Sequence, residues 1–307
     1  MANTQQFSLG IDLGGTKIEV IALDQTGNEH FRKRIDTPKN STASIQYQEI
    51  LNAIAHLVSQ CENHLKQYQL PLGIGIPGSE SLDTGLIKNA NTTCLIGKPF
   101  RDDLSHMLQR AVKIENDANC FALSEAMDGA GKHAQSVFAV ILGTGVGGGW
   151  VINKHLMVGP NHICGEWGHN PLPWPSEQDA QQQTCYCGKL GCIETYLSGP
   201  GWAKQTELEQ NIKLNSKEIV EQRHNVTAAQ QSYRLYVERL AKSLASVINI
   251  MDPDVIVLGG GLSNIVSLYE DIPKVWGKYV FSDGVKTQLV QNQYGDSSGV
   301  RGAAWLN

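Results

Sequence analysis

Hydrophobic and polar positions form short blocks along the first forty residues, and these blocks predict strands. Residues 7 to 24 read as an apolar strand, a glycine turn and a second apolar strand, and "EHFRKRID" adds a third. From about residue 41 to 67, apolar residues recur three and four positions apart, which predicts an amphipathic helix. We therefore expect a three-strand meander followed by a helix.

The middle of the chain continues this succession. "LPLGIGIPGS" reads as a buried strand that runs into a glycine- and proline-rich loop. "AVKIENDANCFALSEAMDGA" reads as a strand, a polar turn and a helix. Both segments fit an α/β protein.

The opening pattern returns in the second half. Residues 136 to 159 are again an apolar strand, a glycine-rich turn and a second strand, and helices are expected near 216 to 222 and 226 to 250. The strands "DVIVLGGG" and "TQLVQ" and a helix from about Ser297 complete the chain. Two such units predict a duplicated α/β architecture; the alternative is two unrelated α/β domains that each contain a glycine hairpin.

Three glycine turns at strand ends favour the duplicated arrangement. Two lie on hairpins, in "DLGGTK" and "GTGVGGG", and the third, Gly259 to Gly261, opens a helix. Glycine lets a backbone approach a ligand closely, and a nucleotide held in a cleft between two domains needs such turns. The stretch "GIDLGGTK" is nevertheless not a Walker A loop, because its lysine follows the hydroxyl residue and a strand, not a helix, comes next.

Composition narrows the functional classes. The chain has 307 residues, of which 18% are charged and 41% hydrophobic, so it is an ordinary globular protein with room for two domains. A net charge of −5 argues against nucleic acid or a membrane surface as partner. The N-terminus resembles no secretion signal, and no window reaches roughly 18 apolar residues. We expect a cytoplasmic protein without a disulfide framework.

Four residues have the spacing of a metal site. Cys185, Cys187 and Cys192 fall within the segment "CYCGKLGC", and His169 lies upstream in "GEWGH". Three thiolates and one imidazole suit tetrahedral zinc, and four protein ligands leave no open position, so this zinc is expected to be structural. The alternative is three incidental thiols.

Three carboxylates stand beside these features. Glu166 precedes His169 and Glu194 follows Cys192, so a zinc ion would fix both glutamates next to each other, in a pair suited to sugar hydroxyls. Asp117, in "ENDAN", lies between a strand and a helix. It is either a helix N-cap or a general base that accepts a proton from an attacking hydroxyl.

The order of the motifs "DLGGTK", "ENDAN", "GTGVGGG", "GEWGH", "CYCGKLGCIE" and "LGGG" closely resembles the ROK family of sugar kinases, from about Leu9 to Leu306. This resemblance implies an actin-like, ribonuclease-H-like duplicated fold with a cleft between two domains. It places residues 1–116 and about 295–307 in a smaller domain and residues 117–294 in a larger one with a zinc-binding insertion. It also implies ATP and magnesium as cofactors, domain closure and a homodimer.

The resemblance assigns roles residue by residue. Asp117 corresponds to the catalytic base. The expected sugar contacts are Asn116, Asp117, Glu166, His169 and Glu194, and the expected zinc ligands are His169, Cys185, Cys187 and Cys192. The residues expected to hold the nucleotide and its magnesium are Asp12, Gly14, Gly15, Thr16, Lys17, Gly143, Thr144, Gly145, Gly259 and Gly260.

Within the family, "LIKNANTT", "GEWGHNPLPW" and "GDSSGVRGAAWL" look most like bacterial fructokinases that also accept mannose. The expected reaction is phosphorylation of the 6-hydroxyl of fructose, and N-acetylglucosamine or glucose is the alternative substrate. Cys94 departs from the fructokinase pattern, which generally has tryptophan there. A sugar-responsive repressor is the less favoured class, because its helix-turn-helix would precede the first hairpin, which here begins near Phe7. A non-catalytic sensor would be expected to lose Asp117.

Overall fold

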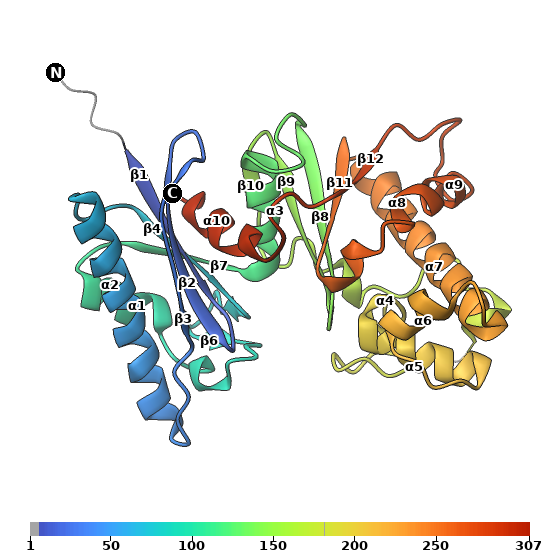
Figure 1. The fold of residues 1–307 in the computed structure, drawn as a ribbon, viewed down its shortest axis with the longest axis horizontal. Coiled ribbons are helices and arrows are strands. Elements are labelled where there is room, and N and C mark those ends of the chain that lie inside the picture. The colour runs from blue at the N-terminus through green and yellow to red at the C-terminus, as the bar shows by residue number, and fades with distance from the viewer. Residues whose placement is uncertain (1–5, 181) are drawn as a thin grey trace. The chain divides into compact units, whose positions relative to one another are not determined.

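The computed structural model describes residues 6–180 and 182–307 and divides into two compact units. The first unit contains the chain up to Lys132, residues 158–162 and residues 296–307; the second contains residues 133–157 and 163–295. In Figure 1 the first unit therefore combines the blue N-terminal strands with the red helix α10 from the end of the chain. No helix in the described ranges has both the length and the apolar character needed to cross a membrane.

The first unit is built on one five-stranded sheet. Its strands, in spatial order, are β3 (Glu29–Asp36), β2 (Lys17–Asp24), β1 (Phe7–Leu13), β4 (Leu72–Ile76) and β7 (Val112–Asn116). The first three strands are an antiparallel meander, and β4 and β7 continue the sheet in parallel. The predicted meander is confirmed, including its third strand.

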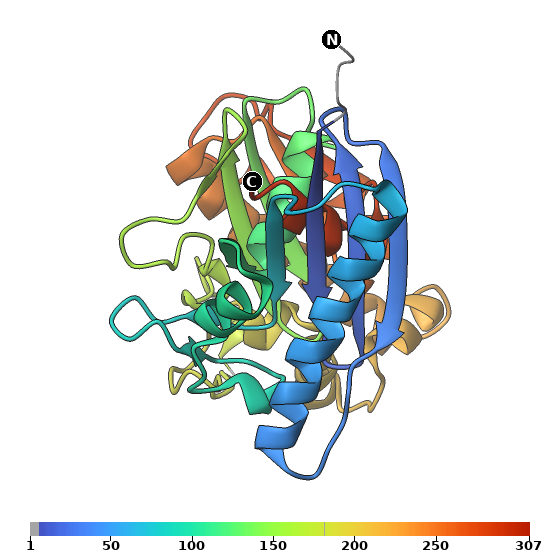
Figure 2. The same ribbon diagram turned by 90° about the vertical axis from the view of Figure 1, so that its left-hand side faces the viewer.

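One face of this sheet packs on α1 (Ala43–Leu65), as Figure 2 shows. Side chains alternate between the two faces of a strand, so Leu9, Ile11 and Leu13 all point to the same side of β1. They are fully buried in one core with the apolar stripe of α1. The helix predicted from about residue 41 to 67 is thus confirmed, and its three- and four-residue spacing is the pattern that covers the sheet.

The intervening positions of β1 and β4 face α10 (Ser298–Ala304) at unusually short range. A Cβ atom at Gly10 would lie 2.2 Å from a backbone oxygen of α10, and one at Gly73 would lie 2.0 Å from another. Only glycine fits at such distances. Gly299 of α10 also lies close to the Asp12 carboxylate, because a Cβ there would be 3.3 Å from it. The C-terminal helix thus covers the face of the sheet that carries Asp12.

The second unit repeats the first. Its sheet consists of β10 (His155–Met157), β9 (Val146–Ile152), β8 (Ser136–Leu142), β11 (Val255–Gly259) and β12 (Gln288–Gln291), in that order. Again the first three strands in the chain form an antiparallel meander, and the last two join β8 in parallel. The same strand order and directions in both sheets confirm the predicted duplication.

Helices of the second unit pack on its sheet around three large aromatic side chains, Tyr196, Trp202 and Tyr236, all of them buried. The helices of this unit are α4 (Glu194–Leu197), α5 (Gly199–Gln210), α6 (Ser216–Gln222), α7 (Thr227–Met251), α8 (Leu268–Asp271) and α9 (Pro273–Trp276). The first unit also contains the strands β5 (Ser79–Glu80) and β6 (Ile87–Lys88) and the α-helices α2 (Phe100–Leu108) and α3 (Asp117–Met127).

The units do not divide at residue 116, where the domain boundary was expected, but after Lys132. The reason is the packing of α3 in the first unit. Gly302 of α10 approaches the backbone of α3 so closely that a Cβ atom would lie only 1.6 Å from the Cys120 oxygen. Helix α3 is therefore held by the C-terminal helix, and Asp117 at its start belongs to the first unit.

Candidate functional site

The turn between β1 and β2 contains Gly14, Gly15 and Thr16, and Gly15 to Lys17 are exposed. Thr37 fixes this turn: its hydroxyl donates to the Gly14 oxygen at 2.7 Å, and its N–H donates to the Thr16 oxygen at 2.9 Å. Strand β2 begins at Lys17, so the turn joins two strands, as predicted. A glycine turn held in this way can present backbone N–H groups to phosphate oxygens.

Asp12, one residue before the end of β1, has a perturbed carboxyl group. Burial, the negative charge of Asp117 and the negative charge of Glu19 raise the pKa of Asp12 to about 7, against a smaller opposing effect of Arg34. Arg34 is already engaged by Glu19, at 2.6 Å. Excess negative charge of this kind favours a bound cation, and magnesium is held in proteins by one or two carboxylates together with substrate phosphates.

The raised pKa of Asp12 predicts a pH-dependent stability. Folding favours the protonated form of Asp12 over the ionised form. The contribution of Asp12 to the free energy of unfolding is therefore fully present below about pH 4 and is lost as pH rises through about 7. In magnesium-free buffer, Asp12→Asn should therefore increase the free energy of unfolding at pH 8, on the order of a few kcal/mol, and by less at pH 5. Urea unfolding at both pH values measures this, with the exposed Asp83→Asn as control. An equal effect at both pH values would contradict it.

The start of α3 settles which residue caps the helix. The Asn116 side chain accepts a hydrogen bond from the Asn119 N–H at 2.7 Å and is the N-cap. Asp117 is the first residue of the helix, is exposed, and accepts from the Ala118 N–H at 2.8 Å through one oxygen. Asn116 is thus the capping residue, and the role of Asp117 as a base stays a prediction.

In the second unit, the turn between β8 and β9 is tied to the residues that follow Cys192. The Gly199 N–H donates to the Gly143 oxygen at 2.8 Å, and the Val146 N–H donates to Glu194 at 2.9 Å. A Cβ atom at Gly145 would lie 2.8 Å from the same carboxylate oxygen, so a side chain there would displace the Glu194 carboxylate. Glu194 therefore fixes the shape of this glycine turn.

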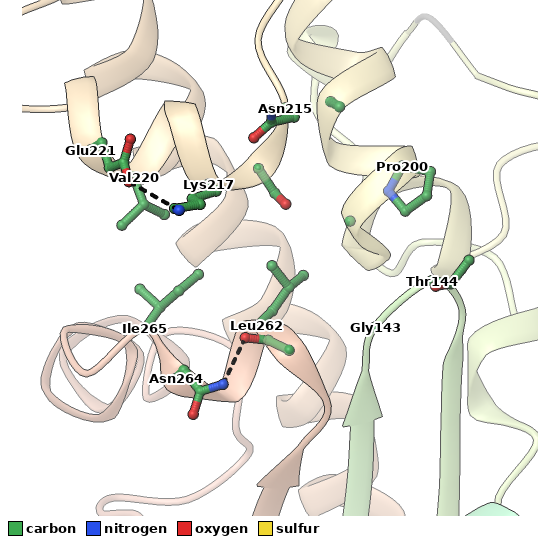
Figure 3. Close-up of a pocket in the computed structure, with 14 residues that line it drawn as sticks. Gly143, Thr144, Pro200, Asn215, Lys217, Val220, Glu221, Leu262, Asn264 and Ile265 are labelled. Carbon is green, nitrogen blue, oxygen red and sulfur yellow. Dashed lines mark hydrogen bonds and ion pairs between the residues drawn. The ribbon is translucent and has the colours of Figure 1, made fainter. Parts of the chain in front are cut away.

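A pocket of about 790 Å³ opens beside the same turn (Figure 3). Gly143 and Thr144 line it on one side, and Gly261, Leu262 and Ile265 line it on another. Its lining is mostly apolar with a few polar groups, which is the usual character of a small-molecule site. A nucleoside is of a suitable size and chemistry for it.

The predicted residues Gly259 and Gly260 do not line this pocket. Gly260 has a φ of 78°, and a Cβ atom there would lie 2.5 Å from the Leu142 oxygen. It therefore turns the chain so that Gly261 and Leu262 reach the pocket. No sequence motif predicted the opposite wall, which includes Pro200, Asn215, Ser216, Lys217, Val220 and Glu221. The one signal for it was the capping box "NSKE", which marks the start of α6 at Asn215.

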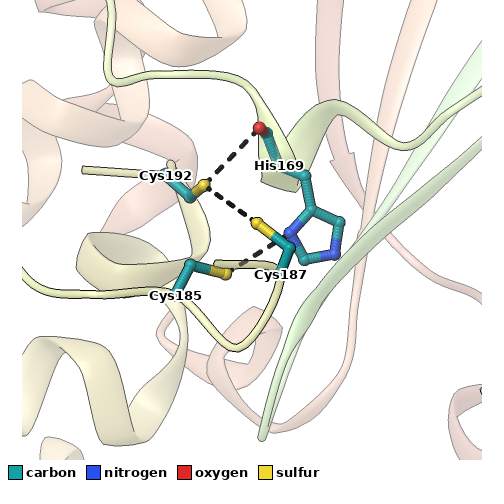
Figure 4. A group of neighbouring side chains, drawn as sticks. All are labelled: His169, Cys185, Cys187 and Cys192. Atoms are coloured by element: carbon teal, nitrogen blue, oxygen red, sulfur yellow. Dashed lines mark hydrogen bonds between the residues drawn. The ribbon is translucent and has the colours of Figure 1, made fainter. Parts of the chain in front are cut away.

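The four predicted zinc ligands come together in the second unit (Figure 4). One ligand atom from each of His169, Cys185, Cys187 and Cys192 lies within 4.8 Å of all the others. The Cys185 Sγ to His169 Nδ1 distance is 3.5 Å, and the Cys187 Sγ to Cys192 Sγ distance is 3.6 Å. Ligands about 2.0 to 2.3 Å from a tetrahedral zinc lie about 3.3 to 3.8 Å apart, and these two distances fall in that range.

The three thiols of this cluster differ in pKa. Burial raises the pKa of Cys192 to about 12, and burial also raises the pKa of Cys185. The pKa of the more exposed Cys187 is lowered, mainly by a hydrogen bond from the Lys189 backbone. Because its pKa is lowered, Cys187 is the thiol of the three that deprotonates most readily. Zinc binds thiolates, so metal binding would release the protons of all three thiols.

Glu166 and Glu194 both raise the pKa of Tyr186, whose side chain contacts His169. The Tyr186 hydroxyl lies 2.9 Å from His169 Nε2, the nitrogen that faces away from Cys185. Burial, the charge of Glu194 and the charge of Glu166 raise the pKa of Tyr186 to about 12. Two carboxylates therefore converge near one imidazole and one phenol. Tyr186, 83% exposed, is a member of this group that the sequence analysis did not identify.

Buried ion pairs join the segment before the cysteines to helix α7. Asp179 lies 2.8 Å from both Arg239 and Lys242 of α7, and all three side chains are buried. Burial opposes the ionised form of Asp179, but hydrogen bonds from Lys242, Ser176 and Arg239 outweigh it and lower the pKa to about 2. Such a buried, fully paired charge holds the polar segment in one position.

Comparison with known proteins extends these observations over the whole chain. The model of the ROK family matches residues 8–307. The chain is 40% identical to an N-acetyl-D-glucosamine kinase of Vibrio atlanticus over 303 residues, which cover 97% of this chain and 98% of the relative. It is 41% identical to the N-acetyl-D-glucosamine kinase of Vibrio cholerae, with the same coverage.

Solved structures of ROK proteins have the same fold as this chain. A ROK hexokinase from Thermus thermophilus has a TM-score of 0.85 at 26% identity and covers 98% of this chain and 97% of its own. A ROK glucokinase from Streptomyces griseus, solved with glucose and AMPPNP, has a TM-score of 0.72 at 26% identity, with 98% of both chains covered. The two-unit structure is thus the expected actin-like ATPase fold. On its motifs, its duplicated topology and these matches, the chain belongs to the ROK family.

Proposed function

We propose that this protein is an ATP-dependent sugar kinase that phosphorylates the 6-hydroxyl of N-acetyl-D-glucosamine. The observation that carries the proposal is the full-length identity of about 40% to two N-acetyl-D-glucosamine kinases. Fructose, the sugar expected from the motifs, finds no support in these relatives, and N-acetylglucosamine was the alternative. Cys94 carries no argument for either sugar, because its side chain is buried in the core of the first unit.

In the first unit, Asp117 is proposed to be the general base. Its exposed carboxylate at the start of α3 would accept the proton of the attacking hydroxyl, and the neighbouring Asn116 would bind the sugar. Asp12 would hold magnesium, which offsets the charge of the nucleotide phosphates when bound. The turn from Gly14 to Lys17 would supply backbone donors to those phosphates.

In the second unit, the pocket of about 790 Å³ is proposed to bind the adenosine of ATP, and the turn of Gly143, Thr144 and Gly145 its phosphates. Glu166, His169 and Glu194 are proposed to accept or share hydrogen bonds with sugar hydroxyls. The cysteine–histidine cluster would hold a structural zinc ion that keeps these three residues in place.

The test is ADP release by the purified protein with Mg-ATP and N-acetylglucosamine, N-acetylmannosamine, glucose, mannose or fructose. The proposal expects kcat/KM for N-acetylglucosamine to exceed that for each other sugar by about tenfold or more. A preference for fructose or glucose would retain the kinase reaction and overturn the substrate. Absence of turnover with every sugar would overturn the kinase activity itself.

A further inference from the structure

A second pocket, of about 260 Å³, lies in the first unit beside the proposed base. Segments far apart in the sequence line it, including β5, the start of α2 and the end of β7. Its lining residues include Glu80, Leu82, Arg101, Ile114 and Asn116. Asn116 immediately precedes Asp117, so the pocket adjoins the proposed sugar site. It is smaller than the roughly 300 to 1,000 Å³ of a site for a whole drug-sized ligand and fits a substituent of the sugar.

Two opposite charges form one wall of this pocket. Arg101 Nη2 lies 2.9 Å from Glu80 Oε1, and the side chains are 47% and 18% exposed. Burial raises the pKa of Glu80, and the charge of Arg101 opposes that effect. The pair offers a strong hydrogen-bond acceptor next to a strong donor, with no net charge. Such a wall suits a neutral group with a donor and an acceptor of its own. Glu115 also lines the pocket, and its Oε1 already accepts from the Asn116 N–H and the Asn119 side chain.

The pair is held by a well-defined hairpin. Gly78, before β5, has a φ of 135°, and a Cβ atom there would lie 2.8 Å from the Lys88 oxygen of β6. The Ile87 N–H of β6 donates to the Lys98 oxygen at 3.0 Å, three residues before Arg101. The hairpin that carries Glu80 is thus bonded to the segment that leads into α2. Both charged groups are positioned before any ligand binds, which lowers the entropic cost of binding.

We propose that this pocket, the acetamido pocket, receives the 2-acetamido group of the sugar. Glu80 would accept a hydrogen bond from the amide N–H, and Arg101 would donate one to the carbonyl oxygen. An acetamido group has one donor, one acceptor and a methyl group, and Leu82 and Ile114 supply apolar surface for the methyl. The inference rests on the proposed function and assigns the choice between N-acetylglucosamine and glucose to two residues outside the family motifs. Both sugars have the same 6-hydroxyl, so the pocket affects which sugar binds and not the chemical step.

The experiment compares kcat/KM for N-acetylglucosamine and for glucose in wild type, Glu80→Gln, Arg101→Met and Arg101→Lys. Arg101→Met should lower the value for N-acetylglucosamine about 10- to 100-fold, chiefly through KM, and change the value for glucose less than about threefold. Glu80→Gln should act in the same direction. Arg101→Lys, which keeps a charged donor, should recover part of the loss. Lys204→Met, in the exposed pair with Glu207 at 2.9 Å, is the matched control and should change neither value.

Three results separate the possibilities. Equal losses for both sugars, or unchanged values for both, would overturn the acetamido pocket while the proposed kinase activity stands. A wild type that prefers another sugar would instead overturn the proposed substrate. Wild-type protein also tests the pocket without any substitution: glucosamine, which has an ammonium in place of the acetamido group, should bind more weakly than N-acetylglucosamine by isothermal titration calorimetry. Equal affinity for the two would contradict the proposal.

Discussion

Asp117→Asn is expected to lower kcat for sugar phosphorylation by about 10²- to 10⁴-fold. The asparagine amide has the same shape but cannot accept the proton of the attacking hydroxyl. It can still accept the hydrogen bond from the Ala118 N–H, and Asn116 still caps α3, so the fold is retained. ADP release at saturating sugar and Mg-ATP measures kcat, and thermal unfolding and binding of a non-hydrolysable ATP analogue measure fold and nucleotide affinity.

The control for this variant is Glu270→Gln, which also neutralises an exposed carboxylate in the first turn of a helix, α8. It should keep wild-type kcat, because a change of helix-terminal charge alone is worth a fraction of a kcal/mol. Turnover by Asp117→Asn within about threefold of wild type would refute the assignment of the base. A large loss accompanied by a lower melting temperature would show that Asp117 is needed for folding instead.

Local patterns were sufficient to predict most of the fold. Strand alternation, helical spacing and glycine turns involve residues close together in the sequence, and they gave the meanders, the long helices and the duplication. The clustering of the four candidate metal ligands was also predictable, because Cys185, Cys187 and Cys192 are close in sequence and His169 lies only sixteen residues before Cys185.

Features that depend on long-range packing were not predictable. Gly302 lies 182 residues from Cys120 along the chain, yet its contact with α3 places Asp117 in the first unit. The pocket proposed to bind adenosine is similar: Asn215 and Lys217, at the start of α6, line one wall and have no sequence signal for ligand binding. Hydrophobic periodicity shows which face of an element is buried, but not which distant element it meets.

The sugar was the hardest feature to predict, for a chemical reason. Asn116, Asp117 and Glu166 bear groups that suit hydroxyls common to many hexoses, so motifs that contain them cannot distinguish one hexose from another. The distinguishing groups on the acetamido-pocket proposal are Glu80 and Arg101, which are 21 residues apart and meet only in the folded chain. Motif resemblance therefore identified the family but not the sugar.

Removal of the cysteine–histidine cluster is expected to cause the largest loss of stability. The purified protein should contain about one zinc ion per chain, and the Cys185→Ser/Cys187→Ser double variant should contain almost none. A structural zinc contributes directly to folding, because the unfolded chain holds no preformed site. Loss of several kcal/mol should lower the melting temperature by on the order of 10 °C. Elemental analysis and thermal unfolding measure the two effects.

The matched control is Cys164→Ser, the same substitution at a half-buried thiol of the second unit outside the cluster. It should keep the zinc content and the melting temperature of wild type. Because Glu194 holds the Val146 N–H at 2.9 Å and lies two residues after Cys192, the double variant should also bind the ATP analogue more weakly without sugar present. Metal-free wild-type protein of unchanged stability would exclude a structural zinc. Zinc loss with unaltered nucleotide affinity would show instead that the metal stabilises only the insertion. Glu194 would then hold the turn of Gly143, Thr144 and Gly145 without the metal.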